Sequence, residues 1–287
     1  MTFAARDVAA EPTHKLVTRD LPGVKDGDPA GGVTAENRAV GVLLEYGDAV
    51  HLRVDSKHGQ FETIRSEFAR VPESEQVFVG SERVYRASLP GDRPLVESVL
   101  EISAGDTAEW VDRTFYLDAF AILTDESWLY HSIPHETHIR ECNASEHDEL
   151  VAALNETLES VPGSAVVPAD GFVSWTIGGV TYELDWDSLH RYAGADSHAM
   201  YDLERLQRVC VQTPEAVLRL DWSPASAESL LQRAWWWVVN SESATPPTRV
   251  RVPDGERANA VLDAFDRLRS ALDYSYEVGN SDRSSDE

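Results

Sequence analysis

A run of histidines and acids between residues 131 and 147 is the strongest candidate for chemistry in this sequence. It reads His131-Ser-Ile-Pro-His-Glu-Thr-His-Ile-Arg-Glu-Cys142, with His147 beyond. Imidazole, carboxylate and thiolate groups are the ligands that zinc and other transition metals take in proteins. The run therefore suggests a metal site at His131, His135 and His138, and with it a metal-dependent hydrolase.

The backbone expected for this run weighs against the metal site. If the chain turns at 134–136, Ser132 faces His138, and His131 then points to the opposite face from His138. A helix would be interrupted by Pro134. Neither H-E-x-x-H nor a pair of C-x-x-C motifs occurs. Polar residues on the surface of a hairpin are the interpretation that we favour here.

Three consecutive tryptophans, Trp235, Trp236 and Trp237, are candidates for binding rather than catalysis. On a helix their side chains point about 100° apart, and on a strand Trp236 faces away from the other two. At least one indole ring is therefore expected near a surface or an interface, and tryptophan is enriched among the residues that dominate binding. The alternative is a helix packed on all sides between the two halves of the chain.

Other catalytic patterns are missing from the sequence, which has no G-x-S-x-G, no G-x-G-x-x-G after a strand and no Walker lysine. Carboxylates are too numerous for a glycosidase pair to stand out. Asp187, Ser188 and His190 are one of many Ser-His-Asp sets, and adjacency in sequence does not indicate a triad. We therefore name no catalytic residue.

Apolar residues recur at helical spacing in two segments, each with a charged opposite face. One helix is predicted over 150–161, and a second from Ala258 to Leu272 after a cap at Asp254. A third helix is predicted over Pro224–Val239, with proline at its first position.

Alternating apolar and polar residues predict strands in hairpin-like groups. One hairpin is expected over 175–186 around Gly178-Gly179, and another over 42–54 around Gly47-Asp48. Together with the helices, these strands predict an α+β protein of two tandem antiparallel β-sandwich or half-barrel modules, each closed by a C-terminal amphipathic helix.

Composition divides the chain into five parts. Residues 1–37 are rich in Pro, Gly and Asp and are expected to be a poorly ordered lead-in. A first β-rich module with its closing helix follows over 38–161, and then a Pro- and Gly-containing linker over 162–171. The second β-rich module covers 172–275, and 276–287 is expected to be a disordered polar tail.

The two modules share short matches in the same order along the chain. Gly47–Ser56 aligns with Gly179–Ser188, and the helix after Ile139-Arg140 aligns with the helix after Val250-Arg251. Such an order favours an internal duplication, a tandem repeat of one module. Two unrelated halves are the alternative.

The order of elements in the second module matches a known domain type. A two-strand start is followed by Tyr201–Val209, Val217–Trp222, Thr248–Pro253 and a closing amphipathic helix. Over about residues 172–272 this order resembles a prokaryotic pleckstrin-homology-like (PH-like) domain, with the helix at 224–239 as an insertion. The resemblance implies a curved β-sandwich or half-barrel plugged by the last helix, and a protein-interaction platform. Lipid-binding members rely on basic loops, whereas the loops here are acidic or neutral.

Acidic side chains are spread along the whole chain rather than gathered in one block. The 287 residues include 50 Asp and Glu against 25 Lys and Arg, for a net charge of −25. Only Lys15, Lys25 and Lys57 are lysines. This composition resembles that of proteins from salt-loving archaea and indicates a solvated acidic coat. Clustered basic residues for nucleic-acid phosphates are absent from the sequence.

The compartment expected for this chain is the cytoplasm. The N-terminus lacks the charged start and apolar stretch of a signal peptide, and the longest apolar run is far shorter than a membrane span. Cys142 and Cys210 are expected to be buried and free rather than joined.

These observations predict a non-enzymatic protein-interaction or scaffold protein of a high-salt cytoplasm, which binds a protein partner or a second copy of itself. No cofactor is expected unless the histidine run holds a transition metal such as zinc. The alternatives are the metal-dependent hydrolase and a structural subunit of a larger assembly.

The acidic coat makes stability depend on salt. At about 1 M salt the Debye length is near 3 Å, so repulsion between the carboxylates is screened there. We expect the protein to lose structure below a few hundred millimolar salt. Thermal unfolding followed by circular dichroism in dilute buffer and in molar KCl checks this, and an equal melting temperature in both would contradict it.

Overall fold

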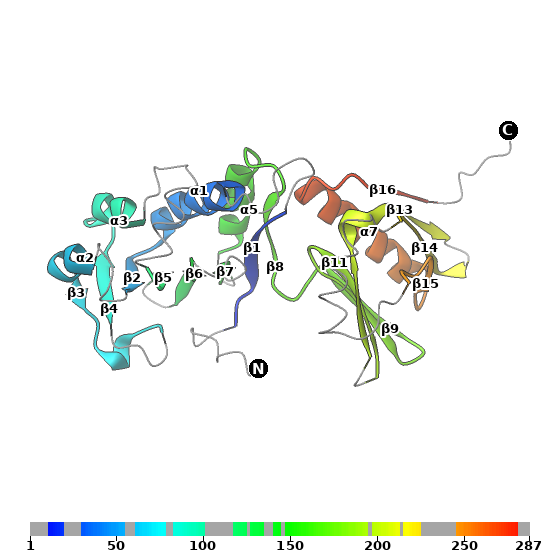
Figure 1. The fold of residues 1–287 in the computed structure, drawn as a ribbon, viewed down its shortest axis with the longest axis horizontal. Helices are drawn as coiled ribbons and strands as arrows, with labels where there is room; N and C mark the ends of the chain where they lie inside the picture. Colours follow the sequence, from blue (N-terminus) through cyan, green and yellow to red (C-terminus); the bar gives the residue numbers. More distant parts are fainter. Residues whose placement is uncertain are drawn as a thin grey trace. The chain divides into compact units, whose positions relative to one another are not determined.

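The computed structural model divides the chain into two units, Met1–Ala169 and Asp170–Glu287. The chain is α+β with mostly antiparallel sheets, as predicted (Figure 1). Among the residues that the structure describes, no helix is long and apolar enough to cross a membrane. The described residues are 11–19, 30–54, 61–78, 83–100, 117–124, 127–134, 140–144, 147–194, 197–212, 215–224 and 245–280.

One antiparallel sheet of eight strands runs through the first unit, in the order β3-β4-β2-β5-β6-β7-β1-β8. β1 pairs with both β7 and β8, so the two ends of this unit are tied into the same edge of the sheet. The strands are β1 (His14–Thr18), β2 (Ala49–Arg53), β3 (Ala69–Arg70), β4 (Val84–Ser88), β5 (Ala119–Leu123), β6 (Trp128–Ser132), β7 (Arg140–Cys142) and β8 (Ser164–Pro168).

Two helices, α1 (Ala30–Tyr46) and α5 (Asp148–Leu158), pack against each other and against one face of this sheet. The apolar stripe predicted for α5 is confirmed, since Leu150, Leu154 and Leu158 are buried. The shorter helices α2 (Phe61–Glu67) and α3 (Arg93–Leu100) contact β3 and β4, and the short 3-10 helix η1 (Glu73–Glu75) follows β3.

The hairpin predicted over 42–54 is wrong in its first half. Residues 42–46 are the last turn of α1, and only Ala49–Arg53 forms a strand. Val33, Val40, Leu43 and Leu44 are buried at helical spacing, and this pattern continues into the segment predicted as a strand.

Three strands lie in segments for which composition predicted irregular structure. β1 lies within the expected lead-in 1–37, β8 within the expected linker 162–171, and β16 (Glu277–Asn280) within the expected tail 276–287. In β1 and β8, short apolar runs such as Leu16-Val17 are buried between polar, Pro and Gly residues. Composition averaged over ten or more residues conceals strands of four or five residues.

The second unit contains two sheets of four strands and one long helix. The hairpin predicted at Gly178-Gly179 is confirmed, and both glycines have positive φ, 58° and 80°. The first sheet has the order β12-β11-β10-β9 and the second β15-β14-β13-β16, with β16 parallel to β13. The strands are β9 (Val173–Ile177), β10 (Val180–Leu184), β11 (Ser188–Ala193), β12 (His198–Asp202), β13 (Leu206–Gln212), β14 (Val217–Trp222), β15 (Arg249–Arg251) and β16.

The two sheets of this unit contact each other through aromatic side chains. Trp175 on β9 donates its indole N–H to the Arg251 carbonyl on β15 at 3.1 Å. The ring of Tyr201 on β12 lies 6.1 Å from that of Trp222 on β14, between centroids. The face of the first sheet that bears Trp175 and Tyr201 is therefore its inner face.

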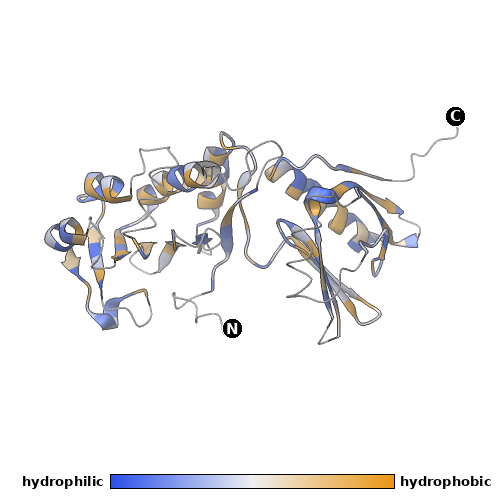
Figure 2. Ribbon diagram, viewed as in Figure 1, coloured by the Kyte–Doolittle hydropathy of each residue, from blue (hydrophilic) through white to orange (hydrophobic). Residues whose placement is uncertain are grey.

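Helix α7 (Gly255–Ala271) packs against β13 and β16. It begins as predicted at Asp254, whose carboxylate accepts a hydrogen bond from the Arg257 backbone N–H at 2.7 Å. Val261, Phe265 and other apolar residues at helical spacing are buried, and hydrophilic residues alternate with them along the helix (Figure 2).

A buried carboxylate joins α1 to the eight-stranded sheet. Glu36 on α1 is 1% exposed, and one of its oxygens accepts hydrogen bonds from the hydroxyls of Tyr130, at 2.9 Å, and Ser132. Its other oxygen lies 3.5 Å from Nε of Arg140, which is 4% exposed. A Cβ at Gly32 would approach the Arg140 guanidinium within 3.1 Å, so glycine makes room for this charge beside the helix.

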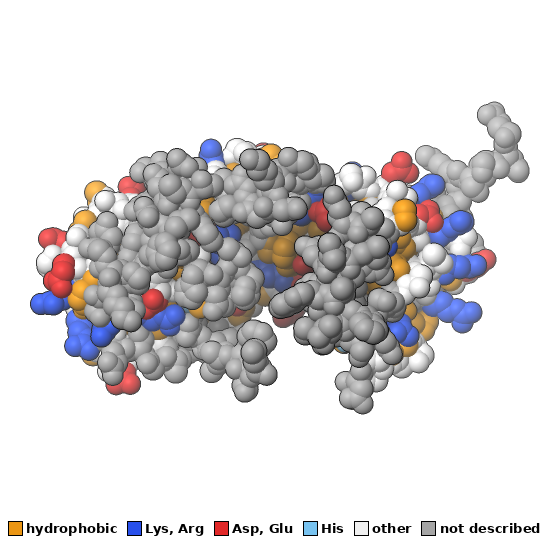
Figure 3. Space-filling model, viewed as in Figure 1, with side chains coloured by type: hydrophobic (Ala, Val, Ile, Leu, Met, Phe, Trp, Pro, Cys, Tyr) orange, Lys and Arg blue, Asp and Glu red, His pale blue; other side chains and the backbone are white. Residues whose placement is uncertain are grey.

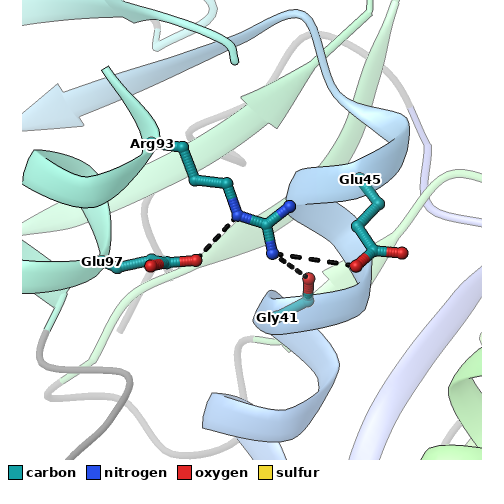
Figure 4. A network of polar contacts seen from close by, with 4 residues as sticks. All are labelled: Gly41, Glu45, Arg93 and Glu97. Atoms are coloured by element: carbon teal, nitrogen blue, oxygen red, sulfur yellow. Dashed lines mark hydrogen bonds and ion pairs between the residues drawn. The ribbon is translucent and has the colours of Figure 1, made fainter. Parts of the chain in front are cut away.

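A second contact to α1 lies at the surface (Figure 4). Arg93, on α3, donates to the Glu97 carboxylate at 2.7 Å and to the Gly41 carbonyl of α1 at 3.4 Å. Its guanidinium also lies 3.8 Å from Glu45, whose side chain is 65% exposed. Because water screens this pair, it stabilises the fold far less than a buried pair can.

The opposite face of the sheet carries two buried histidines. His51 on β2 and His131 on β6 flank Ala121 of β5 in register, so they share one face. They are 1% and 2% exposed, and the Phe78 ring lies 5.7 Å from that of His131. No ring nitrogen of either histidine has a hydrogen-bond partner within the described residues. Burial lowers the pKa of His51 to about 4, and nearby Arg86 acts in the same direction.

Glu36→Gln is expected to lower the free energy of unfolding by about 3–5 kcal/mol, because it leaves the buried Arg140 charge without its partner. The amide can still accept from Tyr130 and Ser132, so the change isolates the charge. Glu45→Gln on the same helix is the matched control, with an expected loss below about 0.5 kcal/mol. Denaturant unfolding in molar KCl measures both, and equal losses would contradict the role of the buried pair.

Acid is expected to destabilise the first unit through His51. The unfolded chain binds a proton at His51 below the ordinary pKa of 6.5, whereas the folded chain stays neutral down to about 4. Stability therefore falls as the pH drops through this window, by at most about 3 kcal/mol, and is complete above it. His51→Leu should remove this part of the pH dependence. Denaturant unfolding of both proteins across the window checks it, and parallel curves would contradict it.

Candidate functional site

The predicted metal residues of the first unit are only partly within the described chain. His131 is buried on β6, and its Nδ1 lies 3.7 Å from the Glu141 carboxylate. His135 and His138 lie outside the described residues. The hairpin is present, but Ser132 pairs with Arg140 rather than with His138, so its register differs by two residues from the predicted one.

Trp235, Trp236 and Trp237 also lie outside the described residues, as does nearly all of the helix predicted over Pro224–Val239. Cys142 and Cys210 are free and buried, as predicted. Burial, with Glu141 nearby, raises the pKa of Cys142 to about 12. At neutral pH this thiol is protonated and is a poor nucleophile and metal ligand.

The described residues with the richest chemistry lie on the outer face of the β9–β12 sheet, which we call the acidic face. Met200 on this face is 51% exposed, and no Lys or Arg occupies its strand positions. Alternation of side chains along paired strands brings these positions together. They are Ser174, Thr176, Thr181, Glu183, Ser188, His190, Tyr192, His198, Met200 and Asp202.

A chain of hydrogen bonds crosses the acidic face. The Ser188 hydroxyl donates to the Asp187 carboxylate at 2.7 Å and lies 2.9 Å from Nε2 of His190. Nδ1 of His190 lies 2.9 Å from Nε2 of His198 on the neighbouring strand. Since Ser188 has one proton and gives it to Asp187, His190 donates from Nε2 and accepts at Nδ1 from His198. With this assignment each of the three hydrogen bonds has one donor and one acceptor.

The geometry of this chain differs from that of a catalytic triad. In a triad the histidine accepts the serine proton and is itself held by the carboxylate. Here the carboxylate of Asp187 binds Ser188 directly, and the far nitrogen of His190 faces His198. Ser188 is therefore not activated as a nucleophile.

Aromatic rings and carboxylates surround the two imidazoles. The rings of His190 and His198 are 4° from parallel with centroids 5.2 Å apart, and the Tyr192 ring lies 4.6 Å from that of His198. Burial lowers the pKa of His190, although Asp185, Glu183 and Asp187 act in the opposite direction. Burial also raises the pKa of Asp202, and the charge of Asp187 adds to this. The carboxylates of this face are thus crowded and lack a cation at the strand positions.

The outer face of the second sheet of the unit carries arginines with acids interspersed among them. Exposed arginines gather there, which we call the arginine face: Arg208, Arg219, Arg249 and Arg251. Figure 3 shows basic side chains (blue) with interspersed acids (red) where Figure 1 places β13–β15. Arg249 pairs with Glu215 at 2.9 Å, whereas the Arg208–Glu277 and Arg219–Asp221 pairs are 3.9 Å apart and exposed.

The turn between β10 and β11 brings together one set of groups that could hold a metal. One ligand atom from each of Asp185, Asp187 and His190 lies within 4.8 Å of the others, and all three residues are half-buried. The sequence showed Asp187 and His190 together but not their contact with His198. That contact depends on the register of β11 with β12, which pairs Tyr192 with His198.

No protein-family model, curated protein or solved structure matches this chain.

Proposed function

We propose that the protein is a non-enzymatic interaction protein whose second unit associates with other copies through its acidic and arginine faces. The observation that carries the proposal is the uneven distribution of basic side chains between these two outer faces. A chain with a net charge of −25 has four arginines on the outer face of one sheet and no Lys or Arg at the outward strand positions of the other, where Arg191 of β11 is on the inner side. The surface of a second copy therefore supplies a complement to each face.

Contact chemistry supports this pairing in a salty medium. At about 1 M salt only charges within roughly 3 Å feel each other strongly, so long-range attraction contributes little. Arginine can form bidentate bonds to carboxylates such as Glu183 and can stack on rings such as Tyr192. Exposed Met200, in the middle of the acidic face, adds an apolar contact that does not depend on salt.

The association differs from a two-fold dimer, because each copy offers one face and receives the other. Such head-to-tail contacts repeat into rings or open chains. The two predicted functions, a scaffold protein and a structural subunit of a larger assembly, are thus combined in one proposal. The metal-dependent hydrolase has less support, since His131 is buried and the pKa of Cys142 is high.

The second unit is proposed to be a PH-like interaction platform, with α7 as its closing helix. The order of two four-stranded sheets followed by α7, and the contacts of α7 with β13 and β16, support this assignment. For the duplication, the aligned segments fall on elements of the same type, α5 with α7 and β7 with β15. The sheets differ, since eight strands of the first unit form one sheet, and the duplication stays a prediction. The acidic composition supports a high-salt cytoplasm.

Single charge reversals on the two faces are expected to abolish self-association, and mixing them to restore it in a limited form. Glu183→Arg disables the acidic face, and Arg219→Glu disables the arginine face. Each variant alone should be monomeric in molar KCl, since every head-to-tail contact needs an intact acidic face on one copy and an intact arginine face on the other. Mixed together, they should form a 1:1 dimer that cannot grow.

Analytical ultracentrifugation of the full chain measures these states. Asp263→Arg, on the exposed side of α7, is the control and should associate like the wild type. A monomeric wild type at high micromolar concentration would contradict the proposal. So would variants that associate unchanged, or a mixture that stays monomeric.

A further inference from the structure

We propose that Asp185, Asp187 and His190 bind one divalent transition-metal ion at the turn between β10 and β11, with His198 as a positioning residue. The three ligand atoms lie within 4.8 Å of one another. Two nitrogen or oxygen ligands of a tetrahedral zinc ion are about 3.3–3.6 Å apart, because each bond is about 2.0–2.2 Å long. Small rotations of these side chains are enough to bring the atoms onto one ion.

The donor set selects the class of ion. Two carboxylates with one imidazole suit Zn²⁺, Co²⁺, Mn²⁺ or Fe²⁺, whereas Mg²⁺ and Ca²⁺ prefer oxygen alone. Neither cysteine belongs to this set of ligand atoms, and both are buried, Cys142 on β7 and Cys210 on β13. Open positions on the ion would be filled by water.

The backbone of the turn holds the two carboxylates in place. The Asp185 backbone N–H donates to the Ser188 carbonyl at 2.9 Å, and its carboxylate accepts from the Trp186 N–H at 2.7 Å. The Asp187 carbonyl accepts from the Leu203 N–H at 2.9 Å. Much of the site is thus formed before the ion binds, which lowers the entropy that ordering would cost.

Nε2 is the nitrogen of His190 that lies near the carboxylates, because the Ser188 hydroxyl contacts both this nitrogen and the Asp187 carboxylate. When Nε2 binds the ion, the ring proton moves to Nδ1, which then donates to Nε2 of His198. A metal-bound histidine usually donates its other N–H to such an acceptor, which fixes the orientation of the ring. Both imidazoles thereby change tautomer: in the free protein His198 carries its proton on Nε2, and in the loaded protein on Nδ1.

Ser188 gives the proposal a sharp control. Its hydroxyl is hydrogen-bonded to Nε2 of His190 in the free protein but is not a proposed ligand of the ion. Ser188→Ala removes this competing bond and leaves all ligands in place, so affinity for the metal should be unchanged or higher. His190→Ala and Asp187→Asn remove ligands, and each should weaken binding at least about a hundredfold.

Titration of the full chain with CoCl₂ in molar KCl tests the site, because the visible absorption of Co²⁺ reports its ligands directly. Potassium at this concentration competes for weak sites on the acidic coat. We expect one Co²⁺ per chain, displaced by Zn²⁺. His198→Ala should weaken binding about tenfold, while His198→Gln should restore most of it, because the amide oxygen can accept from Nδ1 of His190.

Nitrogen-15 NMR of the histidine rings with Zn²⁺ gives a second readout, which a merely structural His198 would not produce. The proton of His198 should move from Nε2 to Nδ1 on loading. The site is overturned if the wild type binds no stoichiometric ion, or if His190→Ala and Asp187→Asn bind as well as it does. The positioning role is overturned if the His198 tautomer stays unchanged. None of these residues is altered in the charge-reversal variants, so failure of the metal site and failure of self-association are distinguishable.

Discussion

The ion pair between Glu36 and Arg140 is the constraint on which the first unit depends. A buried carboxylate is stable only when its oxygens are bonded and its charge is paired, and here β6 and β7 supply both. Tyr130 and Ser132 are two residues apart, so both reach the helix side of the sheet. A slip of one residue would turn them to the opposite face. The pair therefore fixes the register of the central strands against α1, and places His131 on the far side.

The alternation of side chains along each strand also determines which residues lie on the surface of the second unit. On β11, Leu189 is buried on the inner side, whereas His190 and Tyr192 project outward. Because both sheets turn one side inward, the unit must have two outer faces, and their composition is free of packing requirements. That freedom is what allows four arginines on one face and no Lys or Arg at the strand positions of the other.

Elements with a strong and complete period were predictable from the sequence. Helix α7 has a cap, a long apolar stripe and a charged back, and its start at Asp254 is confirmed. Helix α1 was not predicted at all: its first part lies within the expected lead-in, where Pro, Gly and Asp residues conceal its stripe, and its last turn was predicted as a strand. The candidate site was half visible, as Asp187 and His190 stand close together in sequence. His198 joins them only through the register of two strands, which a single sequence does not determine.

The carboxylates of the acidic face are proposed to bind a metal ion and to contact a second copy of the chain. Those proposed for each role lie at different places in the fold. At molar salt a carboxylate is neutralised effectively only by a cation in direct contact. Asp185 and Asp187 lie at the turn between β10 and β11, close to His190. Glu183 is the next-to-last residue of β10, pairs with His190 in register and is proposed to contact a second copy. Burial is the main cause of the raised pKa of Asp202, and an ion at the turn would reduce only the smaller contribution of the Asp187 charge. The proposed metal site and the proposed association would therefore use different carboxylates of the acidic face.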